Sequence, residues 1–123
     1  MAQLTEHFSE KELACKCCGK TVMTPEFMTR LETLRKVLGF PLFVTSGYRC
    51  VKHNDTVGGA TGSLHVRGRA VDIAASGAPA HRLIDEAIRL GFTGIGIKQH
   101  GTLAGRYVHI DDGHDTLTFW TYP

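Results

Sequence analysis

The chain lacks an apolar run of the roughly 18–20 residues that a membrane-spanning helix needs. It also lacks a marked excess of charge of one sign, because 14 Lys and Arg residues stand against 12 Asp and Glu residues, a formal net charge of +2. So small an excess does not favour nucleic acid as a partner. The sequence therefore predicts a protein that neither inserts into a membrane nor binds nucleic acid.

A secretory signal is also missing, since Met1–His7 has neither a basic start nor an apolar core. We therefore expect synthesis in the cytoplasm, and for any action outside the cell a release route other than general secretion. Repeats, low-complexity tracts and linkers do not occur. A chain of 123 residues with 42% hydrophobic residues fits one domain over residues 1–123. We expect this domain to be a monomer.

Helix signals occur in the first and middle parts of the chain. A capping box of Ser9 and Glu12 predicts a short helix over 10–14. Thr24–Pro25 begins a second predicted helix that ends at Gly39, and a third begins at Pro79 and ends at Gly91. The residues predicted to face the core of the two longer helices are Phe27, Leu31, Leu34, Val37, Leu38, Leu83, Ile84, Ala87, Ile88 and Leu90.

Strand signals are concentrated in the second half, where apolar residues alternate with polar or small ones. The last two predicted strands are joined by a turn at Asp112–Gly113. We therefore expect an α+β fold with a small antiparallel sheet and helices packed on one side. The predicted strands cover residues 42–45, 70–74, 94–97, 106–111 and 116–122.

Three polar residues are placed so that they meet on one face of this sheet. Asp72 alternates with apolar neighbours in one strand, so it points away from the core, and His109 does the same in another. His65 lies in the loop before the first of these strands and can approach from the side. We expect the three side chains to meet in a groove on the sheet.

Two histidines and an aspartate form a ligand set that zinc accepts while keeping a fourth position open for water. A structural site fills that position from the protein, whereas an open site activates water, because zinc lowers the pKa of bound water to about 7. Taken singly, His109 is also typical of a solvent-facing strand residue and Asp72 of a turn cap. Together with His65 they favour a zinc hydrolase.

Five spaced motifs carry a family resemblance: Ser46–Arg49, His53–Asn54, Val57–Gly59, Ser63–Asp72 and Val108–Asp111. With these motifs the chain resembles the zinc peptidases of the D-alanyl-D-alanine carboxypeptidase type, over about residues 8–120. That superfamily also contains the lysostaphin-type peptidases and the hedgehog signalling domain. The C-terminal part of the chain is similar to a murein endopeptidase subgroup. The N-terminal part, which contains the cysteines, is similar to a short, often phage-encoded subgroup.

The resemblance implies that His65, Asp72 and His109 are the ligands of a Zn2+ cofactor. It implies that Arg49 lies beside the substrate and pairs with a peptide carboxylate. Ser63 stands where relatives carry a hydroxyl near the substrate. The alternative is that the Ser63 side chain caps its own loop. His53 and Asn54 are expected to hold the loop rather than touch substrate. The implied activity is hydrolysis of peptidoglycan stem or cross-link peptides, by an endolysin-like endopeptidase or a D,D-carboxypeptidase.

The sequence departs from the family at Arg106 and Tyr107, where many relatives carry a carboxylate or a histidine. The group that moves the proton must therefore lie elsewhere. We rank Asp111, on the predicted site face, before His114 beyond the turn, and both before His100.

Two further roles remain open near this site. Asp111 is equally well suited to orient a neighbouring group, either His65 or Asn54, in place of moving a proton. Tyr107 can donate a hydrogen bond to an oxyanion.

Cysteines occur at positions 15, 17, 18 and 50, and this C-x-C-C group does not match common zinc-finger spacings. Buried thiols, a disulfide between the group and Cys50, and a second, structural metal all remain open.

A rival function from another class is a non-catalytic, hedgehog-like module that uses zinc for recognition. Because the chain resembles phage enzymes and lacks a signal peptide, phage-type release to the cell wall, or a place in the virion, is a further expectation.

Overall fold

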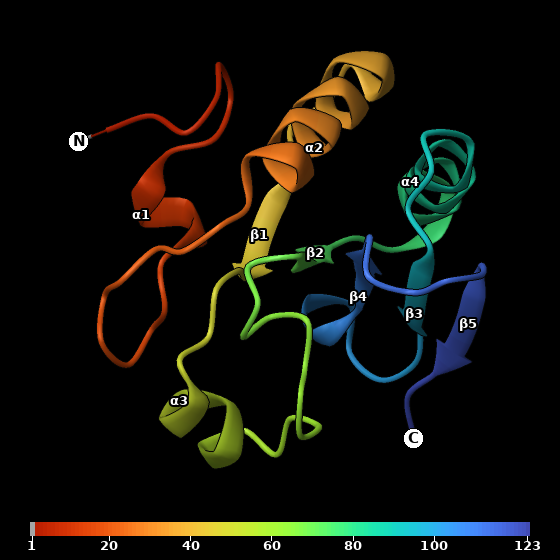
Figure 1. Cartoon of the computed structure of the whole chain (residues 1–123). Helices are drawn as coiled ribbons and strands as arrows, with labels where there is room; N and C mark the ends of the chain where they lie inside the picture. Colours follow the sequence, from red (N-terminus) through yellow and green to blue (C-terminus); the bar gives the residue numbers. More distant parts are fainter. Residues whose placement is uncertain (1) are drawn as a thin grey trace.

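The computed structural model describes residues 2–123 (Figure 1). Over these residues the chain forms four α-helices, a short 3-10 helix and five strands. The helices are α1 (Glu10–Leu13), α2 (Pro25–Leu38), α3 (Val51–Thr56), α4 (Gly77–Arg89) and the 3-10 helix η1 (Leu103–Gly105). The strands are β1 (Phe43–Ser46), β2 (Ala70–Ala74), β3 (Gly94–Lys98), β4 (Tyr107–Asp111) and β5 (Thr118–Thr121).

The strands form a single sheet over the described residues, in the order β1-β2-β4-β3-β5. Neighbouring strands are antiparallel except for β3 and β5, which run parallel. The predicted fold is therefore confirmed as α+β with a mostly antiparallel sheet. The last two predicted strands, joined at Asp112–Gly113, do not form a hairpin, because β4 and β5 are not neighbours in the sheet. Because β2 and β3 already occupy both edges of β4, β5 pairs with the free edge of β3 instead.

Helices α2 and α4 pack against each other and cover one face of the sheet (Figure 1). Both contribute apolar side chains to a core that also contains the inward residues of β2, β3 and β4. One core prediction is wrong: Val37 is 47% exposed, and Met28 is buried in its place. Val37 lies beside the stripe that Phe27 and Leu34 define, so the 3.6-residue period turns it toward solvent. Helix α4 also begins at Gly77, two residues before the predicted start at Pro79.

The other face of the sheet carries α3 and the loop that follows it (Figure 1). The sequence patterns did not predict α3, which has only six residues. The Cys50 thiol accepts a hydrogen bond from the His53 backbone N–H at 3.4 Å and so caps this helix. Because no long helix covers this face, the side chains that point toward it are available to form a site.

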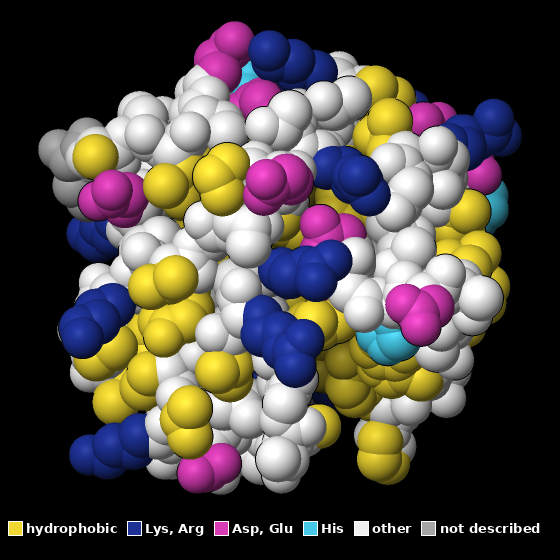
Figure 2. Space-filling view, viewed as in Figure 1, with side chains coloured by type: hydrophobic (Ala, Val, Ile, Leu, Met, Phe, Trp, Pro, Cys, Tyr) yellow, Lys and Arg dark blue, Asp and Glu magenta, His cyan; other side chains and the backbone are white. Residues whose placement is uncertain are grey.

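Among residues 2–123, no helix is both long and apolar enough to cross a membrane. On the face drawn in Figure 2, Lys and Arg side chains lie beside Asp and Glu side chains. This mixture of signs agrees with the small net charge of +2.

The N-terminal segment is attached to α2 through the buried carboxylate of Glu32. The backbone N–H of His7 donates to Glu32 Oε1 at 2.7 Å, and the His7 ring Nδ1 lies 2.5 Å from Oε2. Burial raises the pKa of Glu32, but contacts with Thr5 and His7 lower it by more, so it lies below its usual value. The ionised carboxylate is therefore stabilised in the folded protein.

We expect Glu32→Gln to lower the free energy of unfolding at pH 7 by about 1–3 kcal/mol, because hydrogen bonds to a charged group contribute roughly that much. Since the pKa of Glu32 is lower in the folded state, its contribution is complete above the unfolded pKa of about 4.3. That contribution is lost as the pH falls through the folded pKa. Urea denaturation at several pH values measures the difference.

The control is Glu26→Gln, because Glu26 is exposed on the same helix. Equal destabilisation in both variants, or a difference that persists in acid, would contradict the role of Glu32.

Candidate metal centre

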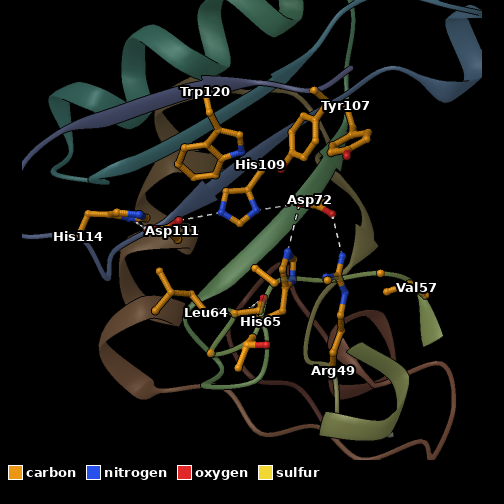
Figure 3. Close-up of a pocket in the computed structure, with 17 residues that line it drawn as sticks. Arg49, Val57, Leu64, His65, Asp72, Tyr107, His109, Asp111, His114 and Trp120 are labelled. Atoms are coloured by element: carbon orange, nitrogen blue, oxygen red, sulfur yellow. Dashed lines mark hydrogen bonds and ion pairs between the residues drawn. The ribbon is translucent and has the colours of Figure 1, made fainter. Parts of the chain in front are cut away.

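His65, Asp72 and His109 converge on the sheet face opposite the helices (Figure 3). Asp72 Oδ1 lies 3.2 Å from His65 Nε2 and 3.0 Å from His109 Nδ1. One possible ligand atom of each residue lies within 4.8 Å of the other two. All three side chains are buried, with residue exposures of 3–7%. The structure thus brings together the three residues that the sequence singled out.

Strand register places two of these residues, and a loop places the third. Asp72 on β2 stands directly opposite His109 on β4, and both alternate with core residues. His65 comes from the turn that follows α3, where its backbone N–H donates to Ser63 Oγ at 3.2 Å. Its ring Nδ1 lies 2.8 Å from the carbonyl oxygen of Gly47. The site therefore rests on a rigid strand pair and on one loop that is tied to the segment after β1.

The donor set fits a divalent transition metal. A tetrahedral ion with bonds of about 2.0–2.1 Å holds its ligand atoms roughly 3.3 Å apart, close to the 3.2 and 3.0 Å found here. The outward nitrogen of each imidazole has an acceptor, Gly47 O for His65 and Asp111 Oδ2 for His109. A proton on the outward nitrogen leaves the inward nitrogen as a lone-pair donor, which is the form that binds metal.

The electrostatics of the site also favour a cation. Burial raises the pKa of Asp72, but hydrogen bonds and charge from His109 and His65 lower it well below its usual value. Burial lowers the pKa of His109, but contacts with Asp111 and Asp72 raise it by more. The two carboxylates that stabilise positive charge on the imidazole also favour a metal ion beside it.

Asp111 lies behind His109 in a row of interactions that runs from His114 to Asp72 (Figure 3). Its carboxylate is 2.7 Å from His109 Nε2 and 2.8 Å from His114 Nδ1, and it accepts the Gly113 N–H at 3.1 Å. Its side chain is 1% exposed. These contacts are those of a residue that orients histidines. The histidines that Asp111 contacts are His109 and His114, whereas the sequence predicted His65 or Asn54 as its partner.

Arg49 is fixed beside the metal ligands. Its guanidinium lies 3.3 Å from Asp72 Oδ2, 3.3 Å from Asn54 Oδ1 and 3.0 Å from Ser46 Oγ. Asn54 is buried and also donates to the carbonyl of Ala60 at 3.0 Å, so it holds the loop as expected. Arg49 therefore orients Asp72 and still faces the cleft.

A cleft of about 620 Å³ opens over these residues. Its walls are the loop from Val57 to Leu64 on one side and residues of β4, β5 and their connection on the other. Ser63 and His114 both line it. His100 does not line it, because its exposed ring contacts the carbonyl of Tyr122 at 3.1 Å. The structure therefore brings His114 to the site and leaves His100 outside.

Two aromatic residues of the cleft, Trp120 and Tyr122, were not among the site residues predicted from the sequence. The Trp120 ring lies 5.0 Å from the His109 ring and 5.6 Å from the His114 ring. Gly96 provides room for it, since a Cβ there would lie 2.5 Å from Trp120 Nε1. Trp120 in β5 and Tyr122 just after it alternate with exposed residues, but this pattern indicates a site only once the strand that pairs with β5 is known.

Comparison with known proteins gives a consistent result. Residues 6–111 match the family model described as Peptidase M15, a range that contains His65, Asp72 and His109. The zinc D-Ala-D-Ala carboxypeptidase of Streptomyces albus G is 33% identical over 100 residues, which cover 78% of this chain. The matched part is 37% of that relative, so the chain spans little more than a third of its length.

We expect Asp111→Asn to weaken binding of a divalent transition metal about 10–100-fold, the usual effect of losing a partner that orients a ligand. An amide in this position no longer fixes the proton of His109 on its outward nitrogen. Competition with a chromogenic chelator measures the affinity. Asp115→Asn is the control, because Asp115 is exposed in the same connection. Unchanged affinity in Asp111→Asn would show that this contact does not orient His109.

Proposed function

The chain belongs to the peptidase M15 family, and we propose that it is a zinc-dependent peptidase that hydrolyses peptidoglycan stem peptides. The convergence of His65, Asp72 and His109 under an open cleft carries this proposal. The name of the Streptomyces relative supports both zinc and a D-Ala-D-Ala terminus as substrate. The volume of the cleft, about 620 Å³, is suitable for a short peptide.

His65, Asp72 and His109 would hold the zinc ion. When bound there, zinc supplies a Lewis acid that polarises the scissile carbonyl and activates water. The protein keeps these ligands in place through Gly47, Arg49 and Asp111, each of which contacts one of them. This arrangement means that the ligands need little reorganisation when the ion or the substrate binds.

Arg49 favours a carboxypeptidase over an endopeptidase. Its side chain is 15% exposed and lines the cleft, so its guanidinium is available to a substrate group as well as to Asp72. A D-Ala-D-Ala terminus ends in a carboxylate, which an arginine binds through two parallel hydrogen bonds. An internal cross-link has no carboxyl terminus at the same position. We therefore propose D,D-carboxypeptidase activity first.

Endolysin-like cleavage of cross-links is the second candidate from the sequence. In that case the protein would be made in the cytoplasm and reach the cell wall by phage-type release, or it would be part of the virion. A non-catalytic recognition module is the third. Product analysis on purified peptidoglycan separates them, because a carboxypeptidase releases free D-alanine, an endopeptidase converts dimers to monomers, and a recognition module releases neither.

We propose that His114 moves the proton during hydrolysis, and that Asp111 orients it. His114 lines the cleft with a side chain that is 33% exposed, whereas Asp111 is 1% exposed. The contact between His114 Nδ1 and Asp111 leaves His114 Nε2 free to accept a proton from water and to pass it to the leaving amine. Asp111 is already engaged with both histidines, so orientation is the role that its contacts support.

Tyr107 is suited to stabilise the oxyanion that forms at the scissile carbonyl. It lines the cleft beside Tyr122, with ring centroids 5.1 Å apart. Burial raises the pKa of Tyr107, and the negative charge of Asp72 raises it further. The phenol therefore keeps its proton at neutral pH and remains a hydrogen-bond donor.

We expect His65→Ala or His109→Ala to abolish zinc binding at this centre, and with it the release of D-alanine from a pentapeptide that ends in D-Ala-D-Ala, because each variant removes one of its three ligands. Metal analysis and chromatography of the products measure the two effects. His100→Ala is the control, since His100 lies outside the cleft. Full activity of either ligand variant would contradict the assignment of the centre.

We expect His114→Ala to lower kcat by about 10²–10⁴-fold, the usual contribution of a positioned acid–base group, while zinc content stays the same. Steady-state kinetics and metal analysis of the same preparations measure this. The matched control is His81→Ala, an exposed histidine on α4. A variant with unchanged kcat, or one that loses its zinc, would rule out proton transfer as the role of His114.

A further inference from the structure

A second cluster of metal-binding side chains lies away from the cleft. Sulfur atoms of Cys15, Cys18 and Cys50 lie within 4.8 Å of one another. Cys15 and Cys18 belong to the turn after α1, whereas Cys50 immediately precedes α3, so the fold brings together residues that are about thirty positions apart. All four cysteines of the chain are free thiols.

The spacing of these sulfur atoms suits a shared metal ion. A tetrahedral zinc site with Zn–S bonds of about 2.3 Å places its sulfur atoms roughly 3.8 Å apart. The Sγ atoms of Cys15 and Cys50 are 3.7 Å apart, whereas a disulfide holds its sulfur atoms at about 2.05 Å. The pair therefore has the separation of two thiolates on one tetrahedral ion.

Local backbone structure is also that of a thiolate metal site. Cys15 and Cys18 have the C-x-x-C spacing of many zinc sites once Cys17 is counted as an intervening residue. The turn is closed by a hydrogen bond from the Cys15 N–H to Lys20 O at 2.7 Å, and Gly19 adopts a φ of 75°.

Backbone amides also point at the sulfur atoms. The N–H of Cys50 donates to Cys15 Sγ at 3.4 Å, and the N–H of His53 donates to Cys50 Sγ at 3.4 Å. Hydrogen bonds of this kind stabilise thiolates that bind a metal.

We propose that Cys15, Cys18 and Cys50 bind a second, structural zinc ion, with Cys17 as the fourth ligand. Sulfur-only tetrahedral sites select zinc or iron, and a structural site takes all four ligands from the protein. Cys17 lies between the two turn ligands and is exposed, and its sulfur stands outside the group of three in this structure, so its side chain would turn toward the ion to complete the set. The thiols lose their protons to solvent as the ion binds. This proposal does not rest on the proposed peptidase activity.

The second ion would brace the segment that supports the cleft. Cys50 follows Arg49, and Gly47 in the same segment accepts the ring N–H of His65. This segment already packs on α1, because the Tyr48 N–H donates to Leu13 O at 2.8 Å. A metal that joins the turn after α1 to Cys50 would hold the segment at a second point. The ion therefore stabilises the position of Arg49 and of the acceptor for His65.

Metal content of matched variants tests the proposal. Protein purified under reducing conditions and with zinc is expected to contain about two ions per chain, and Cys50→Ser and His65→Ala about one each. Serine is a good helix N-cap, so Cys50→Ser keeps the start of α3. Cys18→Ser, in the exposed turn, is a second variant that does not touch a helix end. Circular dichroism shows that each variant is folded.

Cobalt substitution identifies the ligands. Thiolate-to-cobalt absorption should persist in His65→Ala and disappear in Cys50→Ser and Cys18→Ser. Two results would overturn the second site. One is a wild-type protein with a single ion that His65→Ala loses. The other is unchanged metal content in folded Cys50→Ser and Cys18→Ser. A non-reduced mass lower by two hydrogens, from a disulfide between Cys15 and Cys50, would also overturn it. The metal content and the cobalt spectrum are measured without peptide substrate, so failure of this proposal is distinguishable from failure of the proposed peptidase activity.

Discussion

The antiparallel pairing of β2 with β4 sets the geometry of the candidate metal centre. It places Asp72 directly opposite His109, on the face that the helices leave open. The same pairing puts the apolar neighbours of both residues into the core beneath α2 and α4. A shift of register by one residue would exchange the two faces, burying the polar side chains and exposing the apolar ones. The packing energy of the core therefore also fixes the geometry of the metal ligands.

Buried charges are tolerated at this site because each one has a partner. Asp72 contacts both histidines and Arg49, and Asp111 contacts His109 and His114. An unpaired carboxylate at such depth would be strongly disfavoured. A metal ion bound by His65, Asp72 and His109 would join this network as one more positive charge among carboxylates. The polar network thus serves the fold and the candidate chemistry together.

Small residues on β3 make the network possible. Gly94 and Gly96 stand opposite Asp111 and His109, and alternate with Ile95 and Ile97. The isoleucines contribute to the core, while the glycines leave space on the other face for the Asp111 carboxylate and the Trp120 ring. One strand therefore fills the core and opens the site, because successive side chains of a strand point to opposite faces.

Local periodicity and motif spacing were sufficient to predict part of the fold and of the site. Alternation in 70–74 and 106–111 was enough to place Asp72 and His109 on one face, and the string that begins at Ser63 identified His65 as the third member. The capping residues of α1 and α2 were also correct, because a cap is a contact within one turn.

Which distant segments meet became known from the three-dimensional fold. It placed β5 on the outer edge of β3, which brought Trp120 and Tyr122 into the cleft, and it directed Asp111 to His109 and His114 rather than to His65. It also brought Cys50 to Cys15 and Cys18. Pairings of this kind depend on which strand edges are free and on how loops close over long separations in the chain, and neither property is encoded in a local pattern.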